Sequence, residues 1–204
     1  ADSRAGLRMR RDFMRALREC LDAALLDEVE TPVLQTKPSG ALATPFETHH
    51  AALDIPVYMR IAPETYLKRC IVAGFDRVYE FARVFRNEGM DPSHLQDFTM
   101  LEYYAAYWNY VDNMDFTERL LRDVIERCTG SLVVSHAAGD IDFGGEWPRV
   151  SLSHLISEHA GIDISAHETA ESLKVAIKDQ GIFLDDIDHL GRGALIDQLY
   201  KKTV

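Results

Sequence analysis

Two stretches of strand-like composition, joined by a long polar connection, constrain the fold of this chain most. Residues 77–86 and 98–107 are rich in aromatic and β-branched side chains, whereas the connecting residues 87–97 are mostly polar. Stretches of this composition and length are typical of β-strands. The pattern therefore predicts an antiparallel hairpin with an unusually long loop. Long loops in compact domains are commonly functional, so we expect a site at this hairpin.

The side chains on one face of the predicted hairpin combine charges with aromatic rings. Strand side chains alternate between two faces. One shared face carries Glu80, Ala82, Val84 and Arg86, continued by Glu88, and on the second strand Phe98, Met100, Glu102, Tyr104 and Ala106. A buried charge needs a partner, so this set fits a ligand with a negative and a positive end better than an ordinary core. Periodicity alone leaves open a solvated sheet face with weak Arg–Glu cross-strand pairs.

Helices and further strands are predicted around the hairpin. Apolar spacing predicts helices over residues 3–26, 63–73 and 112–128, and strands over 28–34 and 56–61. Pro32 has no amide hydrogen, so its strand must be an edge or be interrupted, and a partner subunit could lie there. After Gly145, short helices at 153–159, 168–179 and 194–201 alternate with glycines. We therefore expect an α+β core over residues 1–145 and a small helical lobe over residues 146–204.

Composition excludes several classes of protein. The chain has 204 residues, 47% of them hydrophobic, and a net charge of −11, which argues against wrapping a nucleic acid. The basic residues between Arg4 and Arg18 fit a solvated or dimer-edge helix face better than an RNA grip. No apolar run approaches the length of a membrane span. Three separated cysteines suggest no disulfide framework and no zinc site, so a cytoplasmic protein is expected.

Several sequence strings resemble the lysyl branch of the class II aminoacyl-tRNA synthetases. Phe85–Gly89, followed by Phe98–Glu102, resembles motif 2 of that class. Glu28–Pro32 resembles the end of motif 1, whose proline lies at the dimer interface. Further similarity to lysyl-tRNA synthetases is carried by Pro45–Phe46, Thr48–His50, Arg60–Glu64 and Tyr66–Arg69. The strings occur in the order of the family between Glu28 and Tyr107.

The resemblance implies a fold, a reaction and a set of site residues. It implies an antiparallel sheet flanked by helices, a homodimer with Pro32 at its interface, and ATP-dependent formation of lysyl-adenylate before transfer to tRNA(Lys). Arg86 would be the catalytic residue, binding the α-phosphate and the lysine carboxylate. ATP would also be bound by Glu88, His94 and Phe98, and lysine by Gly40, Glu64, Glu102 and Tyr104. Glu88 would read the adenine amino group, Phe98 would stack on adenine, and Tyr104 would face the ε-ammonium.

Each of these residues also has an ordinary structural interpretation. Glu64 could merely favour the positive end of its helix, and Gly40 could serve only a turn. Phe98 and Tyr104 could be core residues, and His94 an exposed loop histidine. His49 and His50 are adjacent on a strand and point to opposite faces, so no metal site is expected there.

Parts of the family pattern are absent before Val204. The magnesium-binding acids, the distal lysine carboxylate ligand and motif 3 belong to later strands, so magnesium ligands are expected beyond this chain. We therefore expect residues 1–204 to be an internal part of a longer enzyme and inactive alone. His94–Phe98 also departs from the H-N-P-E-F of the family. Two alternatives stay open: a paralogue that lysylates a protein or lipid, and a non-catalytic dimerisation module.

Overall fold

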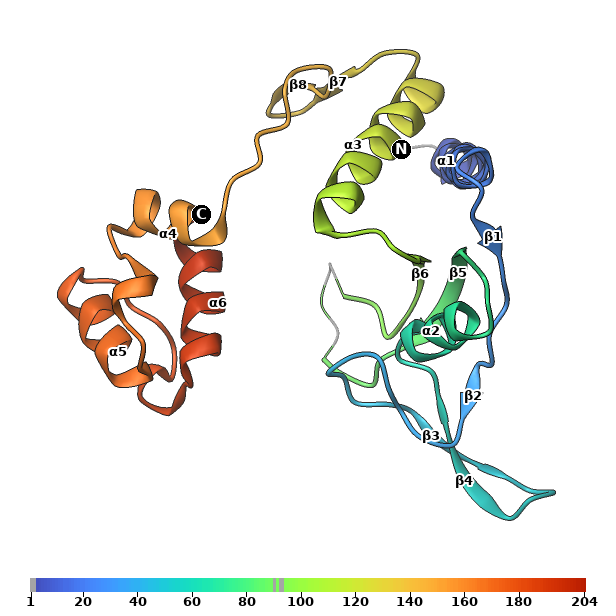
Figure 1. Cartoon of the computed structure of the whole chain (residues 1–204), viewed down its shortest axis with the longest axis horizontal. Coiled ribbons are helices and arrows are strands. Elements are labelled where there is room, and N and C mark those ends of the chain that lie inside the picture. Colours follow the sequence, from blue (N-terminus) through green and yellow to red (C-terminus); the bar gives the residue numbers. More distant parts are fainter. Residues whose placement is uncertain (1–2, 90, 92–93) are drawn as a thin grey trace. The chain divides into compact units, whose positions relative to one another are not determined.

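The computed structural model describes residues 3–89, 91 and 94–204 (Figure 1). The chain divides into two compact units, Ala1–Gly145 and Glu146–Val204. The first unit is α+β and the second is helical. Within the residues that the structure describes, no helix is both long enough and apolar enough to cross a membrane.

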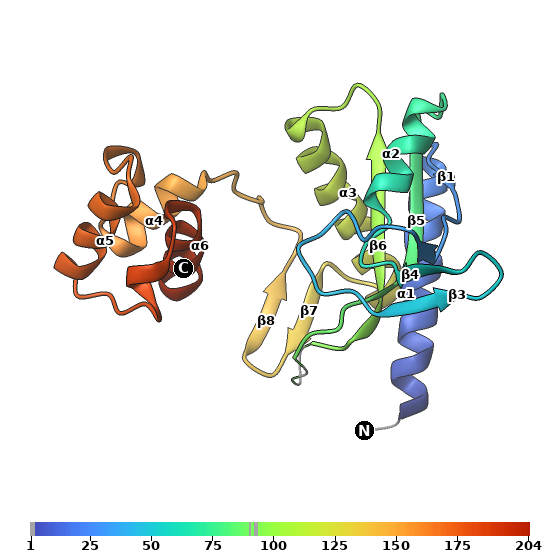
Figure 2. The same cartoon turned by 90° about the horizontal axis from the view of Figure 1, so that it is seen from below.

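The predicted hairpin is confirmed and forms the centre of the first unit. β5 (Arg77–Phe85) pairs antiparallel with β6 (Asp97–Ala105), and Figure 2 shows the two long strands side by side. Glu80 lies opposite Glu102 in this register. The even-numbered side chains of both strands therefore share one face, as predicted. A short strand, β1 (Asp27–Glu28), adds to β5 in parallel.

The strand predicted over residues 28–34 is interrupted, which is one of the two outcomes that Pro32 allowed. After β1 the chain leaves the sheet and returns as β2 (Leu34–Gln35) in a second sheet. That sheet has the order β2-β4-β3, with β3 at Glu47–His50 and β4 at Ile55–Met59. Pro32 lies in the interruption, where it needs no ladder hydrogen bond.

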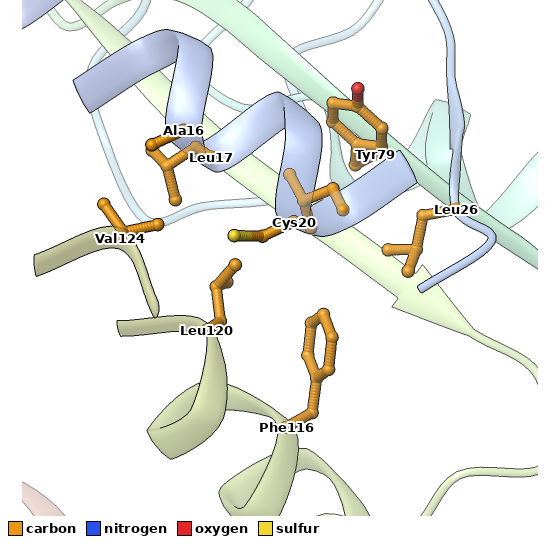
Figure 3. Close-up of a cluster of buried hydrophobic side chains, with 9 residues drawn as sticks. Ala16, Leu17, Cys20, Leu26, Tyr79, Phe116, Leu120 and Val124 are labelled. Atoms are coloured by element: carbon orange, nitrogen blue, oxygen red, sulfur yellow. The ribbon is translucent and has the colours of Figure 1, made fainter. Parts of the chain in front are cut away.

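Helices cover both faces of the β5–β6 hairpin. α1 (Ser3–Ala23) and α3 (Tyr110–Thr129) pack together over the face that carries Tyr79. Their buried core consists of Ala16, Leu17, Cys20, Leu21, Leu26, Tyr79, Phe116, Leu120 and Val124 (Figure 3). α2 (Glu64–Val72) contacts the same two strands from the even-numbered face, since Lys68 lies over the Tyr104 ring.

Local signals in the sequence set the ends of several helices. α3 begins with a capping box formed by Asn109 and Asp112, and it ends at Gly130, whose φ of 76° suits a left-handed C-cap. A short hairpin follows, formed by β7 (Val133–His136) and β8 (Gly139–Asp142). This hairpin was not predicted, because its strands are short and almost entirely exposed and so lack a buried alternation.

The second unit is a small bundle of short helices. It contains α4 (Leu152–Ala160), α5 (Ala170–Asp179) and α6 (Arg192–Thr203), with single 3₁₀ turns at Ile164–Ala166 and Ile187–His189. Side chains of Ser151 and Thr169 cap α4 and α5. The unit has its own buried core of Ile156, Ala160, Ile162, Ile164, Leu173, Ile177, Leu184, Leu195 and Leu199.

A buried ion pair connects the two sheets of the first unit. Arg60, the residue after β4, donates from Nη1 to Oε1 of Glu80 at 2.5 Å. The same nitrogen donates to the carbonyl oxygen of Thr31 at 2.9 Å, and the Thr31 hydroxyl donates to Oε2 of Glu80 at 2.6 Å. Arg60 Nε donates to the carbonyl oxygen of Arg83 at 2.8 Å. Because Arg60 and Glu80 are 4% and 3% exposed, neither charge has water as an alternative partner.

We expect Arg60→Met to destabilise the first unit strongly. The substitution leaves the Glu80 carboxylate buried without its counter-ion, which typically costs about 3–5 kcal/mol. Urea unfolding, followed by far-ultraviolet circular dichroism, measures the loss. The control is Arg127→Met, which breaks an Arg–Glu pair with Glu19 at 2.9 Å whose side chains are half exposed. That control should cost less than about 1 kcal/mol. Equal, small losses for both variants would contradict the importance of the buried pair.

Candidate active site

A cavity of about 410 Å³ lies at the end of the β5–β6 hairpin. It is lined by Arg86, Glu88, Gly89, His94, Leu95 and Phe98. The structure thus brings together all four residues that the sequence predicted for ATP. Positions 90, 92 and 93 of the connecting loop lie outside the described residues.

Arg86 is held just after the end of β5 by hydrogen bonds of its backbone and its side chain. Its N–H donates to the carbonyl oxygen of Gln96 at 2.8 Å, and its Nε donates weakly to that of Ile61 at 3.4 Å. The guanidinium carbon lies 5.3 Å from the centre of the Phe98 ring. Among the residues that the structure describes, no carboxylate forms an ion pair with Arg86. A half-buried guanidinium in this state is suited to binding a phosphate or carboxylate.

Glu88 fixes one side of the cavity to a distant loop. Its carboxylate accepts a hydrogen bond from the N–H of Thr44 at 3.2 Å, and the N–H of Asn87 donates to the carbonyl oxygen of Thr44 at 2.7 Å. The side-chain amide of Gln96 donates to the carbonyl oxygen of Glu88 at 3.2 Å. These bonds hold the start of the 87–97 connection against Thr44 and tie its two ends to each other. Gln96 was not recognised from the sequence as a residue that organises the site.

His94 is exposed and pairs with a carboxylate within the loop. Its ring Nδ1 lies 2.7 Å from Oδ2 of Asp91, and its backbone N–H donates to Oδ1 of Asp91 at 2.9 Å. The aspartate therefore restrains the orientation of the ring at the edge of the cavity.

Gly40 and Glu64 are in direct contact. Gly40 has a φ of +89°, in the region where L side chains are strained. A Cβ added to Gly40 would lie 2.9 Å from the Cβ of Glu64 and 3.2 Å from that of Ala62. Gly40 is therefore required by the close approach of its loop to α2 as well as by its own conformation.

Glu102 and Tyr104 lie next to each other on the even-numbered face of β6. The Tyr104 hydroxyl donates to Oε2 of Glu102 over a long 3.4 Å. Burial, followed by the negative charge of Glu64, raises the pKa of Glu102, whereas the Tyr104 hydrogen bond and the charge of Arg86 lower it. Burial and the charge of Glu102 raise the pKa of Tyr104. Two carboxylates that raise each other's energy in this way favour a cation between them.

Two charged residues of this region differ from the prediction. Glu80 was expected to face a ligand, and Lys68 was not expected at the site. Glu80 shares the even-numbered face but is committed to Arg60, so it is not available to a ligand. Lys68, one helical turn after Glu64, places its Nζ 2.5 Å from Oε1 of Glu64 and 5.9 Å from the centre of the Tyr104 ring. The four-residue spacing to Glu64 was the available sequence signal for Lys68.

The residues considered for other roles are also located. His49 and His50 bond within their own hairpin, to Asp54 and to the N–H of Leu53. In the described part of the chain, no group of three or more histidine, cysteine, aspartate or glutamate side chains is arranged to hold a metal ion. Pro32 is exposed between β1 and β2.

Comparison with known proteins identifies the family of the chain. The profile of the family described as tRNA synthetases class II (D, K and N) matches residues 1–189. The chain belongs to this family.

Curated relatives are similar over most of this class II synthetase chain. It is 43% identical to a lysine–tRNA ligase of Dehalococcoides mccartyi over 204 residues, which is 100% of the chain and 41% of the relative. It is 42% identical to that of Pelotomaculum thermopropionicum, covering 96% of the chain and 38% of the relative. It is 49% identical to that of Porphyromonas gingivalis, covering 85% and 29%. The synthetase chain thus spans well under half the length of these relatives.

Replacing Glu102 by glutamine should stabilise the synthetase chain at neutral pH. Because the folded pKa of Glu102 is raised above its ordinary 4.5, stability falls as the pH rises through the window between those two values. Glu102→Gln removes this loss while keeping an oxygen that can accept from Tyr104. We expect a higher melting temperature than wild type at pH 7, and no difference below about pH 4.

Thermal unfolding between pH 3.5 and 7.5 is the measurement for Glu102→Gln. The control is Glu126→Gln on the exposed side of α3, which should give no comparable pH-dependent gain. A Glu102→Gln variant that is less stable than wild type at pH 7 would show that the ionised carboxylate is stabilising.

Proposed function

We propose that this chain carries the amino-acid- and ATP-facing half of a lysine-activating site, which forms lysyl-adenylate for transfer to tRNA(Lys). The observation that carries the proposal is the half-buried Arg86, which has no ion-pair partner among the described residues and lies between an aromatic-lined cavity and a pair of carboxylates. A site with one anion-binding group between an aromatic ring and two carboxylates suits a nucleotide on one side and an amino acid on the other.

Arg86 has the central role in the proposed reaction. A lysine carboxylate oxygen attacks the α-phosphorus of ATP, a new carboxyl-oxygen to phosphorus bond forms, and pyrophosphate leaves. The Arg86 guanidinium binds the lysine carboxylate and the α-phosphate, so it holds the reacting atoms together and neutralises the charge that develops between them. No side chain has to act as nucleophile.

The remaining residues orient the two substrates. Phe98 stacks on adenine, Glu88 accepts from the adenine amino group, and His94 approaches the phosphates from the loop. Glu64, Glu102 and the backbone of Gly40 receive the α-ammonium, and Tyr104 faces the ε-ammonium. Magnesium, when bound, supplies further neutralisation of the triphosphate. The described residues contain no cluster suited to hold it.

The names of the relatives favour tRNA as the acceptor, and the free Cys20, Cys70 and Cys128 suit the cytoplasmic setting that we propose. Each of the three relatives is named a lysine–tRNA ligase, which supports tRNA(Lys) over a protein or lipid acceptor.

A homodimer is supported by exposed apolar residues on α1 and beside Pro32. These are Leu7, Met9, Phe13, Val33 and Leu34.

Amino-acid-dependent ATP–pyrophosphate exchange by the full-length protein carrying this sequence tests the proposal. Lysine should support exchange, whereas aspartate and asparagine should not. Arg86→Ala should lower lysine-dependent exchange by about two to three orders of magnitude, as expected when a donor to developing charge is lost. The matched control is Arg83→Ala on β5, three residues before Arg86, whose side chain is exposed and pairs with Asp97.

Two outcomes would contradict the proposal. Exchange driven by aspartate or asparagine would overturn the assignment to lysine. A loss below tenfold for a folded Arg86→Ala protein, or equal losses for Arg83→Ala, would remove Arg86 from the reaction.

A further inference from the structure

A lysine side chain of the protein itself lies against the carboxylate proposed to receive the substrate's α-ammonium. Lys68 extends from the second turn of α2, and its ammonium donates to Glu64 Oε1 at 2.5 Å. The same ammonium lies 5.9 Å from the centre of the Tyr104 ring. Glu64 and Tyr104 are two of the groups to which the substrate lysine is assigned. Lys68 therefore presents to them the same chemical group as the substrate.

The carboxylates in this region favour a nearby cation. Glu64 and Glu102 are close enough for the charge of Glu64 to oppose ionisation of Glu102. Gly40 packs against Glu64 and allows the loop to approach it closely. Without a ligand, the ammonium of Lys68 pairs with Glu64 and neutralises part of the negative charge that Glu64 brings to this region.

We propose that Lys68 weakens the binding of the substrate amino acid, as an internal ammonium that occupies Glu64 until the α-ammonium of the ligand displaces it. This inference rests on the proposed function and adds to it a competitor within the chain. A ligand that brings no ammonium leaves the Glu64–Lys68 pair intact and gains nothing at this position. A ligand that brings one releases Lys68 to water, which costs little because the Lys68 side chain is 59% exposed.

The exposure of the pair sets the size of the effect. Exposed Glu–Lys pairs one helical turn apart are favoured over the open state by only about twofold. With a twofold preference for the paired state, Glu64 is free in about one molecule in three. If Lys68 and the ligand compete strictly for Glu64, the apparent affinity for lysine is therefore about threefold weaker than it would be without the pair. Removing the Lys68 charge should therefore tighten lysine binding, although the variant loses a contact.

Lysine titration of the full-length protein carrying this sequence, by isothermal calorimetry, tests the inference. Lys68→Met keeps the length of the side chain and a good helix former but removes the charge. We expect its Kd for lysine to be about threefold lower than that of the wild type. Lys68→Arg keeps a cation one turn from Glu64 and should bind lysine like the wild type.

A matched control separates this effect from the loss of any surface ion pair. Lys201 pairs with Asp197 at 2.8 Å over the same four-residue spacing, on α6 of the second unit, and its side chain is 68% exposed. Lys201→Met should leave the Kd for lysine unchanged. If Lys68→Met leaves the Kd for lysine unchanged or raises it, the role of Lys68 is overturned and the proposed function still stands. Absence of lysine binding to wild type and variants alike would overturn the proposed function, and the inference with it.

Discussion

The buried ion pair between Arg60 and Glu80 is the interaction on which the rest of the first unit depends. Removing two charges from water is costly, and the attraction between them offsets that cost only with good geometry and further hydrogen bonds. Both conditions are met, because Thr31 bonds to both partners and Arg60 also donates to the carbonyl oxygen of Arg83. One guanidinium thereby joins the interrupted segment after β1 to strand β5.

The position of this pair explains the geometry of the site. Arg60 accepts a backbone hydrogen bond from Phe85, and the next residue, Ile61, accepts one from the side chain of Arg86. Glu64 begins α2 shortly afterwards, with Gly40 packed against it. The segment from Arg60 to Glu64 therefore carries the ion pair at one end and a proposed lysine ligand at the other. The hydrogen bonds from Phe85 to Arg60 and from Arg86 to Ile61 place this segment relative to Arg86, and they form without a ligand.

Local pattern was enough to predict the face of the hairpin. The two-residue period placed Arg86, Glu102 and Tyr104 on one side. The observed register of β5 and β6 agrees for Glu102 and Tyr104, and Arg86 follows directly after the last residue of β5. The family resemblance then supplied Gly40, from a distant loop, and Glu64, from the start of α2, which no periodicity could have connected. Their contact is established by the structure, although their binding roles remain a prediction.

Long-range charge pairing was the part that local pattern could not supply. Glu80 looked like a ligand carboxylate because alternation reports the face of a side chain and not its partner. Its partner, Arg60, is 20 positions away and comes from another sheet. In the same way, Pro32 indicated that a strand had to be an edge or be broken, but only the structure shows that the chain changes sheets there.

If the Arg60–Glu80 pair positions the site, removing both charges together should impair the reaction even in a folded protein. In an Arg60→Met/Glu80→Met variant no buried charge is left unpaired, so the protein should be more stable than Arg60→Met alone. In the full-length protein carrying this sequence, lysine-dependent ATP–pyrophosphate exchange by this folded double variant should nevertheless fall by about a hundredfold, because a displacement of about 1 Å in positioning groups has that cost. A folded double variant with wild-type exchange would show that the site is positioned without the buried pair.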